Sequence, residues 1–234
     1  MEEIVKIEEF IGNPVEKWTI DDMARLNENA ELLSLLKSSE VTSEILSRSK
    51  DNRDIADLFV PLYIKSKLTD AERFANNILY EEQEKKITSD ELYKKLLEML
   101  NNDFYFQLAA YLVLISKFPD VYDCSKDEIK IKEAISNIKE ITIGFVERDL
   151  ESTYTLIMEL LELVFPLRSR YFEKYNVDIL DDDDERLSKA LDTIREFEYK
   201  VQEELKQQFS EMTQQDVDDI TEILDKEDKG EANE

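Results

Sequence analysis

Apolar residues recur every three or four positions along much of residues 88–212, which is the period of one face of an α-helix. The first such segment begins at Thr88. A threonine there, followed three positions later by Glu91, forms a capping box, a pair of reciprocal side-chain to backbone hydrogen bonds that starts a helix. The second segment begins near Phe104 and is expected to end before Pro119, because proline disfavours helical dihedral angles at the preceding residue.

Two longer segments complete this pattern. A capping box at Ser125 predicts the start of a long helix, with Gly144 as a soft point and Pro166 as its end. Beyond it, apolar residues from Leu187 to Leu205 are spaced by three or four positions along a narrow stripe, as in helix bundles and coiled coils. Helices of this kind predict a helical bundle as the core of the chain.

Residues 1–87 are less regular, and they predict a smaller, mainly helical N-terminal subdomain. Its first apolar residues, Ile4–Ile11, fit either a short strand or the first turn of a helix. Thr19 is expected to cap a helix. Thr69 is expected to cap another one after the apolar stretch around Pro61.

The joint between subdomain and bundle is expected near 81–87, where charged residues dominate. The end of the chain is acidic and carries a few apolar residues. This composition is typical of a motif that folds on a partner, and also of a frayed last helix followed by a disordered end. The sequence therefore predicts an N-terminal subdomain over 1–87, a helical bundle over 88–212 and a partly disordered acidic tail over 213–234.

Composition indicates an all-α protein and removes most catalytic machinery. Only three of the 234 residues are glycine, whereas sandwiches, barrels and phosphate-binding loops need glycine at their turns. There is no histidine, which excludes His-activated nucleophiles and imidazole metal sites. The single cysteine, Cys124, can form neither an intramolecular disulfide nor a cysteine cluster. No catalytic residue, metal site or cofactor is expected.

Charge narrows the range of partners. Against 56 acidic residues stand 30 basic ones, which gives a net charge of −26. Such a charge repels phosphate backbones, so broad direct contact with nucleic acid is not expected. Acidity either favours a partner with a positive surface or serves solubility alone. No apolar run has the length of a membrane span, and the first residues are acidic, so a cytoplasmic, nucleoid or nuclear location is expected, without a membrane.

Two charged clusters each have a structural and a functional interpretation. The acidic run Asp181–Glu185 lacks the glycine of a calcium loop, and it fits the acidic N-terminus of the following helix better than a metal site. A second cluster interleaves cations with aromatic rings. It fits the cationic end of a helix better than a stacking platform for nucleic acid. Its members are Arg168, Arg170, Tyr171, Phe172, Lys174 and Tyr175.

Three stretches resemble the helical domain of GINS replication-complex subunits: Leu97–Tyr105, Ile138–Arg148 and Leu180–Leu187. In that order, they are similar to the start of that domain, where an acidic residue is followed by Phe and Tyr, to its long helix with an arginine near the middle, and to the acidic start of its last helix. The resemblance implies a non-catalytic scaffold that joins the MCM helicase to other replication factors by packing against sister subunits. Two features depart from the family. Glu151 and Ser152 stand where it usually has basic residues, and residues 1–87 show little strand patterning, although GINS subunits often carry a small β-rich domain.

These observations together predict a protein that acts through protein–protein contacts as a subunit of an oligomer or complex. The expected partner-binding residues are Phe145, Arg148, Tyr154, Ile157 and Leu161 of the long helix, and Val217, Ile220 and Leu224 of the tail. Apolar burial with a charged rim would supply the contact. The alternative is an acidic regulator or inhibitor that occupies a basic groove of a nucleic-acid-binding protein.

Overall fold

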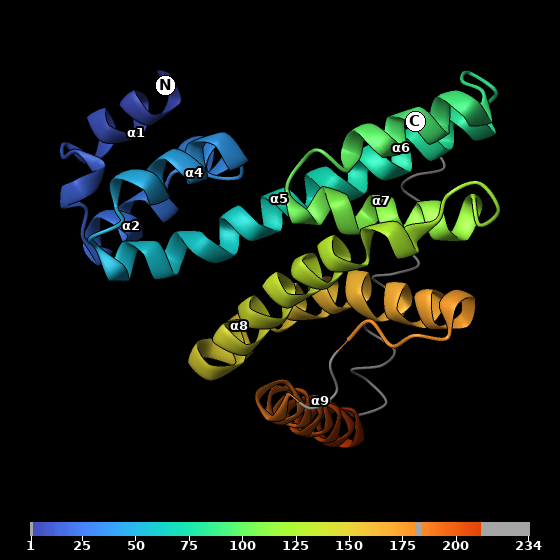
Figure 1. Ribbon diagram of the computed structural model, residues 1–234. Coiled ribbons are helices and arrows are strands. Elements are labelled where there is room, and N and C mark those ends of the chain that lie inside the picture. Colours follow the sequence, from blue (N-terminus) through green and yellow to red (C-terminus); the bar gives the residue numbers. More distant parts are fainter. Residues whose placement is uncertain (1, 181–183, 212–234) are drawn as a thin grey trace, which may run out of the picture. The chain divides into compact units, whose positions relative to one another are not determined.

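The computed structural model describes residues 2–180 and 184–211, and the regular structure in these ranges is helical throughout, with no strand. The predicted all-α class is therefore confirmed. Figure 1 shows the order of the elements. The helices are α1 (Glu2–Ile11), η1 (Val15–Lys17), α2 (Ile20–Asn27), α3 (Ala30–Leu35), α4 (Ser39–Arg48), α5 (Arg53–Gln83), α6 (Ser89–Met99), α7 (Phe104–Lys117), η2 (Cys124–Asp127), α8 (Glu128–Tyr175) and α9 (Glu185–Glu211).

The helices α1 to α4 share one apolar core with the first turns of α5. The strand alternative for Ile4–Ile11 is wrong, because α1 places Ile4, Ile7 and Ile11 on one buried helical face. Trp18 is the largest side chain in this core, with 2% of its surface exposed, and its ring lies 6.1 Å from that of Phe59. Ile55 and Phe59, in the first turns of α5, are thus part of the same core as α1 to α4.

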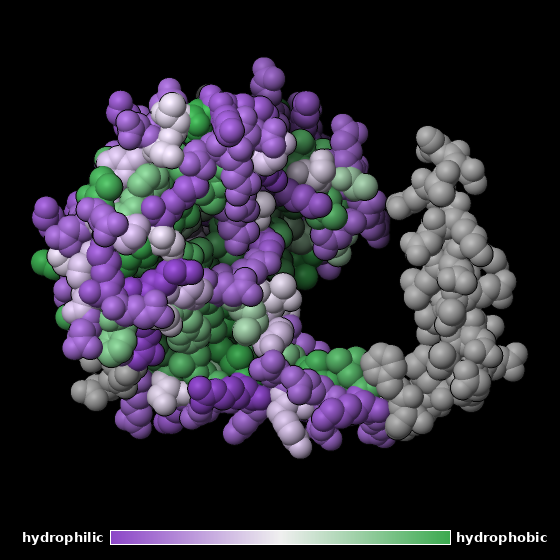
Figure 2. All heavy atoms as spheres, turned by 90° about the vertical axis from the view of Figure 1, so that its right-hand side faces the viewer, coloured by the Kyte–Doolittle hydropathy of each residue, from purple (hydrophilic) through white to green (hydrophobic). Residues whose placement is uncertain are grey.

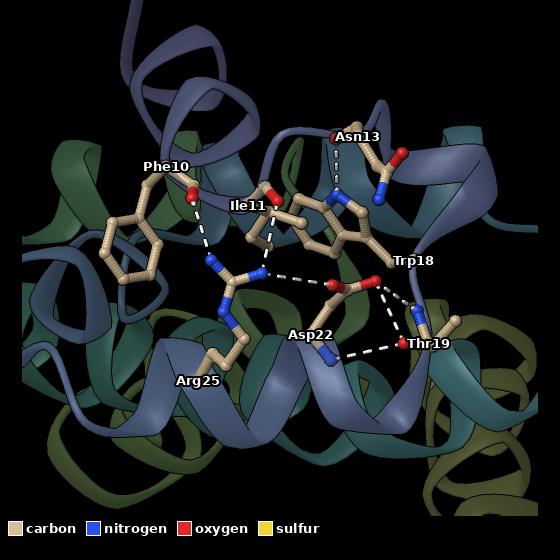
Figure 3. Close-up of polar contacts among 7 residues, drawn as sticks. All are labelled: Phe10, Ile11, Asn13, Trp18, Thr19, Asp22 and Arg25. Carbon is tan, nitrogen blue, oxygen red and sulfur yellow. Dashed lines mark hydrogen bonds and ion pairs between the residues drawn. The ribbon is translucent and has the colours of Figure 1, made fainter.

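Polar contacts fix the bend between α1 and α2 (Figure 3). The Trp18 indole Nε1 donates to the carbonyl of Asn13 at 2.9 Å, which satisfies a polar atom that burial would otherwise leave without a partner. The predicted cap at Thr19 is confirmed: its hydroxyl accepts from the Asp22 amide at 3.2 Å, while the Asp22 carboxylate accepts from the Thr19 amide at 2.9 Å. Arg25 points from α2 to carbonyl oxygens at the end of α1.

One arginine also ties α4 to the preceding segments. The Arg48 guanidinium lies 2.7 Å from a Glu8 oxygen of α1 and 3.0 Å from a Glu16 oxygen of η1. The same Glu8 oxygen accepts from the backbone amide of Val15 at 3.0 Å. A single cation therefore crosslinks three segments, and it holds the pKa of Glu16 below its usual value by hydrogen bonding.

The helix α5 runs without a break from Arg53 to Gln83, so the predicted separate cap at Thr69 is wrong. Its interior contains Pro61, which removes one backbone hydrogen bond and ordinarily costs a helix about 3 kcal/mol. Burial on both sides of the proline maintains the helix. Ile55 packs in the core of the first four helices, and Leu68 lies in the bundle. The stretch predicted as a joint, 81–87, comprises the last residues of α5 and the turn that follows it.

The bundle is built by α5, α6, α7 and α8. The capping box at Thr88 is confirmed, and α7 ends before Pro119 as predicted. A capping box at Ser125 does not form, because Asp123 instead accepts from the Ser125 amide at 3.1 Å and starts the short helix η2. The predicted stop at Pro166 is also wrong. Buried apolar residues on either side of this exposed proline hold the helix together up to Tyr175.

The last described helix, α9, belongs to a second unit that begins at Glu185. The stripe between Leu187 and Leu205 predicts this helix, and it begins at Glu185, the last residue of the acidic run. Of that run, Asp184 is described, and it lies 2.5 Å from Lys139 of α8. Residues 181–183 and the acidic tail, with Val217, Ile220 and Leu224, lie outside the described residues.

Candidate protein-interaction surface

The long helix α8 consists of two arms that meet at Asp149. This residue has φ −160° and ψ 76°, whereas its neighbours are helical. Its carboxylate accepts a hydrogen bond from the amide of Ser152 at 3.3 Å, and its carbonyl accepts from the Thr153 hydroxyl at 2.5 Å. An aspartate in this position is a good N-cap, because its side chain satisfies an amide at the first turn. Residues 128–148 are the first arm and residues 150–175 the second arm.

The two arms run in opposite directions and lie side by side (Figure 1). The Tyr171 hydroxyl, near the end of the second arm, donates to the Glu128 carboxylate at the start of the first arm, at 3.2 Å. One turn further on, the ammonium of Lys174 donates to the carbonyl of Tyr122 at 3.0 Å and also to the carbonyl of Pro119. The second arm is therefore fixed both to the first arm and to the loop before η2.

This arrangement determines where the predicted residues of the long helix lie. Phe145, Ile157 and Leu161 are core residues with 8%, 0% and 7% of their surface exposed. Tyr154 is half-buried. Arg148 is exposed and stands directly before the bend. The structure thus uses three of these five side chains in the chain's own interior, and the contact with a partner stays a prediction for all of them.

Ion pairs connect α5 to both arms of α8. The Arg148 guanidinium lies 2.8 Å from a carboxylate oxygen of Asp57, and Lys65 is paired with Glu159 in the second arm. More than half of the Arg148 side chain is exposed, so this pair contributes little to stability, typically about 0.2–1 kcal/mol. Its consequence is positional, because it places a cation and an anion at the edge of an open surface.

Two large apolar side chains lie on the open side of this edge. Leu58 and Leu62 of α5 have 46% and 39% of their surface exposed. They are one helical turn apart, and Lys65 lies one further turn along the same face. We call the group Asp57, Leu58, Leu62, Lys65, Arg148 and Glu159 the α5–α8 surface. An apolar centre beside charged groups is the usual composition of a protein–protein interface.

A third carboxylate increases the negative charge near Lys65. The pKa of Glu72 is raised, first because neighbouring groups remove part of its hydration and then because the Glu159 carboxylate repels its negative charge. Lys65 acts in the opposite direction, and Glu162 adds further repulsion. Around this one ammonium group, anions are therefore in excess, and the site is electrostatically suited to an additional cation from a partner.

The basic aromatic cluster at the end of α8 is engaged within the chain. Arg168 binds Asp178 through two parallel hydrogen bonds of 2.8 and 2.6 Å, which lowers the pKa of the Asp178 carboxyl. Lys174 donates to backbone carbonyls, as described above. Arg168 and Lys174 therefore bind other groups of this chain, whereas Arg170 is exposed.

The buried ionisable groups beside this cluster are unsuited to chemistry at neutral pH. Cys124 is fully buried, and burial raises the pKa of its thiol to about 12. Burial likewise raises the pKa of Tyr111, and burial together with the hydrogen bond to Asp127 raises that of Tyr122. These groups stay protonated and act as packing and hydrogen-bonding residues. Across the described residues, no group of three or more Cys, Asp or Glu side chains could hold a metal ion.

A shallow groove of about 530 Å³ lies between α1 and α4. Its rim carries the carboxylates of Glu2, Glu3, Glu40 and Glu44, and its lining includes no basic side chain. Hydrophilic residues also predominate on the face drawn in Figure 2, in keeping with the net charge of −26. Both features are typical of a protein that repels anions and attracts cationic groups.

Sequence patterns did not identify the two leucines of the α5–α8 surface. One signal was present, because the stretch from Leu58 to Ile64 is apolar at nearly every position, more than one buried helical face requires. Such an excess indicates that some apolar side chains stay outside the core.

Comparisons with protein-family models, with curated proteins and with solved structures found no match. Within the described residues, no helix combines the length and the apolar character needed to cross a membrane.

Proposed function

We propose that this protein is a non-catalytic interaction subunit that binds another protein through the α5–α8 surface. The observation that carries the proposal is the exposure of Leu58 and Leu62 beside the ion pairs that link α5 to α8. Large apolar groups at the surface, bordered by charges, are a common basis of specific protein contacts. Because Leu58 is 46% and Leu62 39% exposed, complete burial by a partner would add only that fraction of the value for a whole side chain, about 0.6–1.4 kcal/mol each.

The resemblance to GINS subunits gives this proposal a more specific form. In that form, the chain is a scaffold of the DNA replication helicase complex, and its partners are sister subunits or helicase factors. Support comes from the stretches Leu97–Tyr105 and Ile138–Arg148, which belong to α6, α7 and α8. Arg148, which resembles the mid-helix arginine of the family, lies at the edge of the α5–α8 surface.

Sedimentation velocity tests the specific form. The purified chain is mixed with GINS subunits and with the MCM helicase of the same organism, and the sedimentation coefficient is measured for each mixture. The proposal predicts a faster species that contains the chain. A chain that sediments as a monomer in every mixture would remove the replication assignment.

A second candidate function is an acidic regulator that occupies a basic groove of a nucleic-acid-binding protein. The net charge and the carboxylates around the groove between α1 and α4 favour it. Such binding depends on electrostatic steering, so the association rate is expected to fall steeply between 50 mM and 500 mM salt, a range spanning Debye lengths of about 14 to 4 Å. An association that is insensitive to salt would contradict this second function.

A further inference from the structure

The connection between the two arms of α8 is unusually short. Antiparallel helices in bundles are usually joined by about 2–8 residues. In this chain, Asp149 is the only residue with non-helical dihedral angles between the two arms. A reversal of direction over one residue leaves the ends of both arms in close contact.

The sequence at this bend is compatible with an uninterrupted helix. From Val146 to Thr153 the chain contains neither proline nor glycine, and several of these residues are good helix formers. The local feature that favours the bend is the Asp149 side chain, which accepts from the Ser152 amide. Apart from this cap, the packing of the second arm against the rest of the bundle maintains the bend.

That packing is extensive and it connects segments far apart in the sequence. Apolar side chains along the second arm are buried throughout its length. They are Leu156, Ile157, Leu160, Leu161, Leu163, Val164, Leu167 and Tyr171. A single chain with an opened α8 would expose all of them to water, so the opened form is unstable alone. A second copy that offers the same contacts removes this penalty.

We infer that α8 opens at Asp149 into one continuous helix and that two copies of the chain then exchange their second arms. Exchange of an identical element reproduces every closed contact, now between chains, and changes only the hinge. The bond from Tyr171 to Glu128 and the pair of Lys65 with Glu159 would then join two copies. Ile157 and Leu161, which the sequence analysis expected to bind a partner, would pack against the second chain.

The variant Asp149→Ala tests this inference. It removes the cap that favours the bend and leaves a good helix former in its place. After refolding at high concentration, light scattering coupled to size exclusion should show a dimerisation constant roughly 10- to 30-fold above that of the unmodified chain. The reason is that the variant removes one stabilising cap from each of the two closed monomers and none from the opened dimer. Asp149→Asn keeps the cap and should behave like the unmodified chain.

Two controls separate opening of the hinge from loss of stability. Asp103 caps α7 in the same way, with its carboxylate accepting from the Phe106 amide at 3.4 Å, but it follows an ordinary turn. Asp103→Ala should therefore lower the melting temperature without promoting dimers. Insertion of two glycines after Asp149 lengthens the connection and should reduce the dimer below the level of the unmodified chain.

Crosslinking shows which chain supplies the second arm. In a Cys124→Ser background, Lys65→Cys and Glu159→Cys allow reaction with a short bismaleimide. Monomers should crosslink within one chain, and dimers should become covalent dimers on a denaturing gel. The inference is overturned if the folded Asp149→Ala chain stays monomeric at all concentrations, or if its dimers crosslink only within chains. Should that variant not fold, equal dimer levels in the unmodified chain and the glycine insertion would overturn it.

Discussion

The surroundings of Glu72 disfavour the charged form of its carboxyl group. Because its pKa is raised in the folded state, the folded chain holds this proton more tightly than the unfolded chain does. The carboxyl therefore destabilises the fold at pH values above its folded pKa, and this penalty disappears as the pH falls below about 4.5, the ordinary value of the group. Hydration loss and the neighbouring Glu159 are the main causes.

Glu72→Gln should therefore stabilise the protein slightly at pH 7. Exposure to solvent limits the gain to about 0.5 kcal/mol or less, equivalent to roughly 1–2 °C in the melting temperature. The difference between variant and unmodified chain should vanish near pH 4. Thermal melts followed by circular dichroism at both pH values measure it. A loss of stability at pH 7 would show that Glu72 makes a net favourable contact with Lys65.

The burial of Cys124, the only cysteine of the chain, can be tested with a thiol-alkylating reagent. With a thiol pKa of about 12, Cys124 has a thiolate fraction of roughly 1 in 10,000 at pH 8. It is also fully buried. Alkylation by iodoacetamide should therefore be at least about 100-fold slower in the native chain than in urea. Mass spectrometry of samples taken over time gives both rates. Equal rates would mean that the environment of Cys124 is open.

At the residue level, the sequence predicted which reactive groups the chain has better than which side chains are exposed to solvent. The absence of histidine and the isolation of Cys124 could be read directly, because they depend on composition. The burial of Ile157 and the exposure of Leu58 could not, because both side chains are apolar and occur in helical patterns. Which of them faces water depends on how α8 bends and which side of α5 its arms cover, and these are tertiary contacts.

At the scale of the helices, the positions of helix starts and ends were predicted with mixed success. The cap at Thr19 and the capping box at Thr88 were predicted correctly, since each is a local interaction between residues three positions apart. The similar pattern at Ser125 failed because Asp123 accepts from the same amide. The helix breaks predicted at Thr69 and Pro166 do not occur. Apolar burial on both sides of each residue outweighs the local cost of continuing the helix. Local patterns are therefore dependable where no tertiary contact competes with them.

The cap at Thr88 predicts a measurable contribution to stability. Its hydroxyl accepts from the Glu91 amide at 3.3 Å, so Thr88→Ala should cost about 1 kcal/mol, within the range of 0.5–2 kcal/mol known for such caps. Ser38 occupies the same position before α4 but makes no side-chain bond to the helix, and Ser38→Ala should cost less. Urea denaturation of both variants measures the two free energies. An equal or larger loss for Ser38→Ala would contradict this account.

The whole molecule combines a large negative charge with few places suited to chemistry. Its charge is distributed along the chain, since residues 1–59 carry 14 acidic and 7 basic side chains, a net of −7. The described helices bury Tyr105, Tyr111, Tyr171 and the cysteine while leaving Leu58 and Leu62 of α5 open to solvent. The exposed leucines beside charged groups support the proposed contact with another protein.

The most direct test compares which proteins the chain retains when the α5–α8 surface is altered. The variant Leu58→Asp/Leu62→Asp removes its apolar centre, and Val121→Asp is the control, because Val121 is 68% exposed in the loop after α7. Proteins retained by immobilised chains are quantified by mass spectrometry. We expect one set of proteins to bind both the unmodified chain and the control, and to lose at least about tenfold in affinity for the double variant. Equal retention by all three chains would contradict the central claim.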